Sequence, residues 1–253
     1  MTIGQLTPTP PPATCAPGSD YLQPSVTGGN LYVAKQAGTI TSWSTSSPGS
    51  GATYTFKVFR RTSDPDAFEV VGRAETHALS AGVNTFPVDL QVKSGDMIGF
   101  HETGAGATPC TFPMPGDAVL TASADVGDGQ TAQFSPVSGF RLNLSAVLVP
   151  SNSFTITAIR RHPRNGTATL TAAVSNPGIV TLGGQGLRGK HVTIAVARSV
   201  SLKVVTAGKR KRRLYRKGTL RVPVTVTFYP TGGDPSSQTF SIKLSKRRQP
   251  VVV

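Results

Sequence analysis

The chain has 253 residues, enough for one large domain or two ordinary ones. Charged residues make up 15% of it and hydrophobic residues 38%, and it contains 27 glycines and 20 prolines. This composition excludes a coiled coil or helix bundle, which would be rich in Ala, Glu, Lys and Leu, and it differs from that of an acidic disordered chain. Abundant Thr, Val, Gly and Pro favour strands and turns, so the sequence predicts an all-β protein.

The charge is divided unevenly along the chain. Residues 1–150 carry seven basic and eleven acidic side chains, a net charge of −4. Residues 151–253 carry nineteen basic side chains and one acid, Asp234, a net charge of +18. Such asymmetry predicts two units with different partners, the second of which binds polyanions.

The first half is punctuated by turn residues. Residues 1–20 form a Pro/Thr-rich arm with little periodicity. About eight strand-like runs follow, and they predict a jelly-roll-like β-sandwich over residues 21–149. These runs are 31–33, 38–45, 54–61, 67–73, 83–92, 97–102, 118–122 and 140–149. No helical pattern of apolar residues persists beyond two turns.

A second set of strand-like runs begins after the Val-Pro-Ser-Asn-Ser boundary at 149–153, which makes 150–253 the second domain. The clearest run is 220–228, where apolar residues alternate with polar ones at the period of a strand. Pro223 within it indicates an edge strand or a bulge. Seven such runs in about 95 residues predict an immunoglobulin-like β-sandwich. They are 154–158, 167–174, 178–182, 192–196, 200–205, 220–228 and 240–244.

The N-terminus shows no apolar signal sequence, and the chain has no 18-residue apolar run that would span a membrane. Met1 is therefore native to a cytoplasmic protein or stands where a signal peptide has been removed. The Thr-, Ser-, Pro- and Gly-rich composition favours an exported protein. In such a chain Cys15 and Cys110 are expected to form a disulfide, whereas in a cytosolic protein they would remain two free thiols.

Several runs resemble those of exported proteins from high-GC actinobacteria. In the second half they are 164–170, 178–182 and 228–235 with the basic ending, and in the first half they are 23–26, 38–43 and 95–99. The runs of the second half resemble a basic immunoglobulin-like C-terminal module, and those of the first half resemble uncharacterised β-sandwich domains. The resemblance implies an extracellular or cell-wall location. It implies no reaction, because these motifs are structural.

Trp43 is the only tryptophan. Strict alternation along its strand places it on the face opposite Ile40. An exposed Trp43 would stack on a sugar ring, and Tyr32 and Tyr54 would extend this carbohydrate-binding platform. The alternative is that a β-bulge breaks the alternation and Trp43 packs in the core.

The basic residues of the second half gather in two runs. The candidate polyanion-binding residues are Lys209, Arg210, Lys211, Arg212, Arg213, Arg216, Lys217, Lys246, Arg247 and Arg248. Placed on one hairpin, this charge would bind phosphate or carboxylate polymers with salt-dependent affinity. Because neither a recognition helix nor a ladder of aromatic residues is predicted, we expect anionic cell-envelope polymers as partners and no specific nucleic acid. The alternative is a solvated basic loop.

Other motifs point to chemistry less strongly. The run 184–191 resembles a phosphate-binding P-loop, but His191 replaces the required Ser or Thr and a strand follows, which favours a glycine-rich hairpin. Glu75, His77, His101 and Glu102 would form a metal site if their strands paired, but exposed strand faces are the commoner arrangement.

Five aspartates lie at expected turns, where they suit calcium or the turn itself. They are Asp64, Asp66, Asp117, Asp125 and Asp128. No cofactor, metal site or catalytic residue is predicted. The sequence therefore indicates a non-catalytic exported binding or adhesion protein at the cell surface. The alternatives are a carbohydrate-active enzyme with its site in the first unit, and a structural subunit that self-assembles through its sheet edges.

Overall fold

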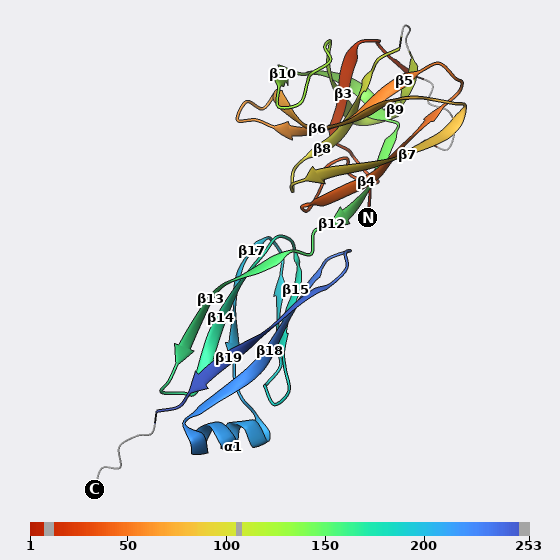
Figure 1. The fold of residues 1–253 in the computed structure, drawn as a ribbon. Coiled ribbons are helices and arrows are strands. Elements are labelled where there is room, and N and C mark those ends of the chain that lie inside the picture. Colours follow the sequence, from red (N-terminus) through yellow and green to blue (C-terminus); the bar gives the residue numbers. More distant parts are fainter. Residues whose placement is uncertain (8–12, 105–107, 248–253) are drawn as a thin grey trace. The chain divides into compact units, whose positions relative to one another are not determined.

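The computed structural model describes residues 1–7, 13–104 and 108–247 (Figure 1). Contacts within the chain divide it into two compact units, Met1–Val149 and Pro150–Val253. Both consist of β-sheets, so the predicted all-β class is confirmed. The described residues include one α-helix, and no helix among them is long and apolar enough to cross a membrane.

Two antiparallel sheets form the first unit. The smaller contains, in spatial order, β1 (Thr2–Gln5), β12 (Leu144–Pro150), β4 (Gly38–Ser47) and β7 (Gly82–Val92). The larger contains β10 (Thr131–Gln133), β6 (Ala67–Ala78), β5 (Thr53–Arg61), β8 (Met97–Glu102), β3 (Ser19–Ser25), β9 (Thr108–Ala122) and β11 (Ser135–Leu142), with β2 (Ala13–Cys15) paired to β9.

Aromatic side chains from both sheets fill the main core of the first unit. Trp43 of β4 stacks on Phe56 of β5 with 5.6 Å between ring centroids, and Tyr54 stacks on Phe100 at 4.5 Å. All four side chains are fully buried. Offset stacking of this kind adds about 0.5–1.5 kcal/mol per pair to the burial of apolar surface. The two sheets are thus joined by a continuous apolar core, in a sandwich-like arrangement.

The N-terminal arm contains two strands that the sequence pattern did not predict. β1 pairs with β12, and the amide of Gly4 donates a hydrogen bond to the Leu31 carbonyl at 2.7 Å. Gly4 adopts a positive φ of 70°, which interrupts the two-residue alternation of this short strand. β2 pairs with β9 and carries Cys15. Residues 8–12 of the arm lie outside the described residues.

Further differences concern the first unit's strands. Residues 31–33 form no strand; they make an isolated bridge between Val33 and Met97 and accept backbone hydrogen bonds from Gly4 and Ile98. In contrast, β3 was not predicted. It lies between β8 and β9, so Asp20 and Gln23 are buried along with its apolar residues and the alternation of polar and apolar positions disappears.

The second unit also contains two antiparallel sheets. The first holds β13 (Phe154–His162), β14 (Thr167–Val174) and β17 (Arg198–Val204). The second holds β16 (Lys190–Ile194), β15 (Gly178–Gly183), β18 (Thr219–Pro230) and β19 (Ser236–Ser245). Each corresponds to one of the seven predicted runs. A single apolar cluster joins the two sheets, and the helix α1 (Gly208–Lys217) contributes Leu214 to it.

Pro223 lies on an interior strand rather than on an edge strand. β18 is flanked by β15 and β19, but its pairing with β15 ends at Thr225, opposite Gly183. Pro223 pairs only with Ser241 of β19. The amide hydrogen that proline lacks is therefore not needed on the β15 side, so the proline breaks no ladder there.

We expect the two units to fold independently. The apolar clusters of the structure lie wholly within one unit or the other. A fragment of residues 150–253 should show a β-type circular dichroism spectrum and a cooperative thermal transition. An unfolded fragment would contradict this expectation, because it would mean that the second unit needs the first for its core.

Candidate anion-binding surface

The basic run of the second unit forms the helix α1, not the hairpin loop expected from the sequence. Lys and Arg have straight side chains that lose little freedom in a helix, which favours this conformation. Leu214 is fully buried and anchors the helix to the core. Gly218 ends it with a φ of 74°, and its amide donates to the Leu214 carbonyl at 2.8 Å.

Most residues of the helix are cations, and Leu214 is its one buried side chain. Seven of its ten residues are basic: Lys209, Arg210, Lys211, Arg212, Arg213, Arg216 and Lys217. All are exposed except the half-buried Arg210. The first turn contains no acidic side chain, and Ala207 makes no side-chain cap. The helix therefore carries a concentrated positive charge that no acid on it offsets.

The end of β19 lies next to α1. Lys246 and Lys211 both place their ammonium groups over the Tyr215 ring, 5.4 and 5.6 Å from its centroid. Lys246 also donates to the Arg164 carbonyl in the β13–β14 turn, and the Arg247 amide bonds to Pro163 in the same turn. The structure thus brings Lys246 and Arg247 to the same end of the unit as α1. Arg248 lies outside the described residues.

This end also contains cations that sequence reasoning did not select. Arg160, Arg161 and Arg164 line a hollow of ≈ 320 Å³ together with Arg247. The run Arg-Arg-His-Pro-Arg at 160–164 was visible in the sequence, but nothing there placed it beside residues 246–247. We call α1, residues 160–164 and residues 246–247 together the basic end of the second unit. Asp234, the unit's single acid, lies in the β18–β19 turn at the opposite end (Figure 1).

A larger hollow of ≈ 600 Å³ opens beside the first turn of α1. Lys209, Arg210 and Arg213 reach it from the helix, and Arg221 reaches it from β18. Its remaining lining residues are uncharged: Gln185, Gly186, Ala207, Gly208 and Leu220. The hollow therefore combines four cations with no acid, the electrostatic environment that attracts an anion.

The proposed carbohydrate platform in the first unit is wrong. Trp43, Tyr32 and Tyr54 are each at most 1% exposed, so none of them offers a ring face to a sugar. The register of β4 against β7 shifts between Ile40 and Ser42, and this bulge puts Trp43 on the same side as Ile40, in the core. Burial also raises the pKa of Tyr32 and Tyr54 well above the usual range of a tyrosine.

The four residues considered for a metal site do not converge. His101 and Glu102 are neighbours on β8 and so point to opposite faces of the sheet. His77 stacks on Phe86 with 4.1 Å between ring centroids, and Glu75 is exposed. These four side chains therefore do not form one set of metal ligands.

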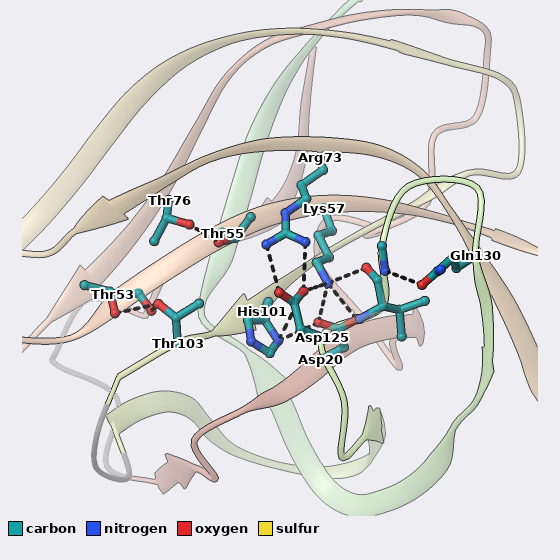
Figure 2. A network of polar contacts seen from close by, with 12 residues as sticks. Asp20, Thr53, Thr55, Lys57, Arg73, Thr76, His101, Thr103, Asp125 and Gln130 are labelled. Atoms are coloured by element: carbon teal, nitrogen blue, oxygen red, sulfur yellow. Dashed lines mark hydrogen bonds and ion pairs between the residues drawn. The ribbon is translucent and has the colours of Figure 1, made fainter.

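A different polar cluster is buried in the first unit (Figure 2). The Lys57 ammonium, fully buried on β5, donates to both carboxylate oxygens of Asp20 at 2.7 and 2.9 Å. It also donates to Asp125 Oδ1 at 2.6 Å and to the Val126 carbonyl at 2.8 Å. His101 Nδ1 lies 2.8 Å from Asp20 Oδ1. Lys57 and Asp20 are thus the centre of this cluster, and the sequence pattern had marked neither of them as a site residue.

Asp20, His101 and Asp125 place one ligand atom each within 4.8 Å of one another, a spacing that suits a metal ion. Lys57, however, already contacts both carboxylates and supplies the positive charge at this place. Partial burial would raise the pKa of Asp125, but its bonds to Lys57 and Arg73 outweigh that effect and hold the pKa below the usual range. The cluster therefore joins the 123–130 loop to three strands of the sheet, as a structural element.

Arg141 and Asp117 form a second buried ion pair in this unit. Burial raises the pKa of Asp117, but the bonds that it accepts from Arg141 and from Thr27 lower it further, to below the usual range. Asp117 and Asp125, which the sequence predicted to lie at turns, are thus both paired with cations.

The predicted disulfide is confirmed. Cys15 of β2 and Cys110 of β9 are joined across 95 residues of sequence, with 5.8 Å between their Cα atoms. Both are buried in the main core. The bond therefore fastens the N-terminal arm to the larger sheet.

Comparison with known proteins finds no protein-family model and no curated sequence that matches this chain.

Proposed function

We propose that this chain is a non-catalytic, exported binding protein that attaches to anionic cell-envelope polymers through the basic end of its second unit. The observation that carries the proposal is the arrangement of charge. Cations from α1, residues 160–164 and residues 246–247 meet at one end, while Asp234 lies at the other end of the twelve-residue strand β18. Such a separation is roughly 40 Å for an extended strand, several Debye lengths at physiological salt. The positive field of the basic end is therefore unopposed.

The chemistry of α1 favours contacts with a charged backbone rather than with bases. Its sequence, GKRKRRLYRK, offers cations and one tyrosine but no Asn, Gln, Ser or Thr. Those polar side chains complement arginine in reading base edges. A nucleic acid would accordingly bind as a generic polyanion, and envelope polymers such as phosphodiester or carboxylate chains are the partners that fit an exported protein.

Export and location belong to the same proposal. The buried disulfide between Cys15 and Cys110 supports an oxidising compartment, because such bonds persist outside the cytosol. The resemblance to exported actinobacterial proteins supports an extracellular or cell-wall location in that group of bacteria. The first unit would then be the part that is displayed or that recognises a further ligand, for which a polysaccharide stays a hypothesis.

We further infer a jelly-roll-like topology for the first unit and an immunoglobulin-like topology for the second. The immunoglobulin-like topology is supported by the second unit's sheets of three and four antiparallel strands around one core. The jelly-roll-like topology is supported by the two sheets that enclose the main core of the first unit. The helix α1 between β17 and β18 is an addition to the simple immunoglobulin-like plan.

The salt dependence of binding tests this function. The logarithm of the affinity of the full chain for an anionic polymer should fall linearly with the logarithm of salt concentration, by about 0.9 per neutralised phosphate on duplex DNA. Replacing Lys209, Arg210, Lys211, Arg212 and Arg213 by Gln should flatten this slope. The melting temperature should change little, because four of these five side chains are exposed and exposed charges contribute little to stability.

A control variant replaces two exposed lysines of the first unit, Lys35 and Lys93, by Gln. It should bind like the parent chain. If the affinity does not depend on salt, or if the α1 variant binds as well as the parent, then α1 is only a solvated helix and the proposal fails.

A further inference from the structure

We infer that the ≈ 600 Å³ hollow beside α1 is a built site for a single phosphate group of a phosphodiester or polyphosphate chain. The inference rests on the proposed function and adds a ligand chemistry to it. A diffuse basic surface attracts all anions according to their charge. A hollow lined by arginines distinguishes phosphate from carboxylate by geometry as well.

The charges that line the hollow come from two separate elements. Lys209, Arg210 and Arg213 extend from α1, whereas Arg221 extends from the start of β18. Because no acid is among the lining residues, the four cations repel one another. An anion placed between them relieves this repulsion. Binding of an anion of charge −1 or −2 in the hollow is therefore electrostatically favourable.

Three of the four cations are arginines, and this favours phosphate. A guanidinium group donates two parallel hydrogen bonds to a phosphate oxygen pair, which an ammonium group cannot do. The guanidinium fork also matches a carboxylate, so the distinction lies in the third dimension. The four oxygens around phosphorus point to the corners of a tetrahedron, so guanidinium groups from α1 and from β18 can donate to a phosphate from different directions, whereas the two oxygens of a carboxylate lie in one plane.

Arg210 is already held in place at the wall of the hollow. Its Nη2 donates to Gln185 Oε1 at 3.2 Å, and its stem packs on Gly186, where φ is +71°. A Cβ atom at position 186 would lie 2.6 Å from Arg210 Cδ, so a larger residue there would push this side chain aside. Since Arg210 is preorganised, less side-chain freedom is lost when an anion binds.

The role of the glycine-rich run 184–191 follows from this contact. It does not wrap a phosphate with its amides, as a P-loop does, because it connects the antiparallel strands β15 and β16. Instead, Gln185 and Gly186 form the wall against which Arg210 lies. The hollow's volume is within the range of about 300–1,000 Å³ that small-molecule sites have, so the groups on either side of the phosphate fit as well.

The test uses inorganic phosphate as the probe and the full chain as the protein. At constant ionic strength, adjusted with chloride, backbone amide signals of Gly186, Gly208 and Arg213 should shift in a saturable manner in NMR spectra. Inorganic phosphate should also displace bound polyphosphate at lower concentrations than it displaces bound polyglutamate. These two polymers separate phosphate recognition from charge alone.

Two pairs of variants locate the site. Arg213→Gln should weaken phosphate binding about tenfold, the scale of one lost charge-assisted hydrogen bond, while Arg198→Gln, an exposed arginine on β17, should leave it within about twofold. Gly186→Ala keeps every charge but displaces Arg210, and it should also weaken phosphate binding. Gly232→Ala imposes the same positive-φ strain, at φ +74° with open space around it, and should not.

Linear, non-saturable shifts, or equal effects of the two variants in each pair, would overturn the inference. If the parent chain bound anionic polymers in a salt-dependent manner but showed no saturable phosphate site, the proposed function would stand and only the discrete site would fail. If the parent chain did not bind anionic polymers at all, the proposed function itself would fail. Melting curves of Gly186→Ala and Gly232→Ala show whether both remain folded at the temperature used.

Discussion

Replacing Lys57 with Met is expected to destabilise the first unit by about 3–5 kcal/mol, the usual cost of breaking a buried ion pair by removing one partner. Lys57 and Asp20 are both 0% exposed, and the substitution keeps the length of the apolar stem but removes the ammonium. Asp20 would then remain buried with its charge uncompensated. Chemical denaturation of the full chain, followed through a probe in the first unit such as Trp43 fluorescence, measures the effect.

Arg73→Met is the matched control for this substitution. Arg73 also pairs with Asp125, but the two side chains are 29% and 39% exposed, so its removal should cost well under 1 kcal/mol. A double variant, Lys57→Met with Asp20→Leu, should recover a large part of the lost stability because no unpaired charge is left. Equal effects of Lys57→Met and Arg73→Met would show that the buried ion pair does not stabilise the first unit.

Removing the disulfide should have an effect of comparable size. The bond between Cys15 and Cys110 closes a loop of 95 residues. The chain-entropy estimate for a loop of about 100 residues is about 4.7 kcal/mol, and measured losses are typically about 2–5 kcal/mol. The Cys15→Ala, Cys110→Ala variant should therefore lower the melting temperature of the first unit by about 2–4 °C for each kcal/mol lost.

A redox control separates the bond from the two side chains. Reductant should lower the melting temperature of the parent chain toward that of the double-alanine variant and should leave the variant unchanged. The transition of the second unit should not move in either case, since both cysteines belong to the first unit. If the variant and the oxidised parent chain melted together, the bond would contribute nothing to the stability of the fold.

The alternation of side chains predicted the second unit well and part of the first unit poorly. β18 has one buried and one open face, so its five apolar residues alternate and are visible in the sequence. β3 is buried between two neighbours, and its polar residue Asp20 is satisfied by Lys57 and His101, which lie 37 and 81 residues away. Such partners cannot be identified from one sequence, because neither spacing nor composition marks them.

The position of Trp43 depended on a single inserted residue. The β-bulge between Ile40 and Ser42 reverses the face of every later residue on that strand relative to the earlier ones. No residue type in this segment announces a bulge. For this reason the sequence alone left the exposed and the buried positions of Trp43 both open, and the structure excludes the exposed one.

The helix α1 could have been predicted from its own residues. Its run of Lys and Arg has high helix propensity, and Gly208 and Gly218 bracket it. Its apolar signal was too weak to detect, because Leu214 is the one buried side chain in the helix. The charge of this segment was therefore recognised correctly, while its conformation and its hollow with Arg221 required the three-dimensional structure.

Lysine footprinting on the full chain tests the attachment of polymers to the basic end most directly. Amine acetylation, quantified by mass spectrometry with and without an anionic polymer, reports which lysines the polymer covers. Attachment at the basic end predicts protection of Lys209, Lys211 and Lys217 on α1, and unchanged reactivity of the exposed Lys35 and Lys93 in the first unit. Equal protection of all five lysines, or protection confined to the first unit, would contradict it.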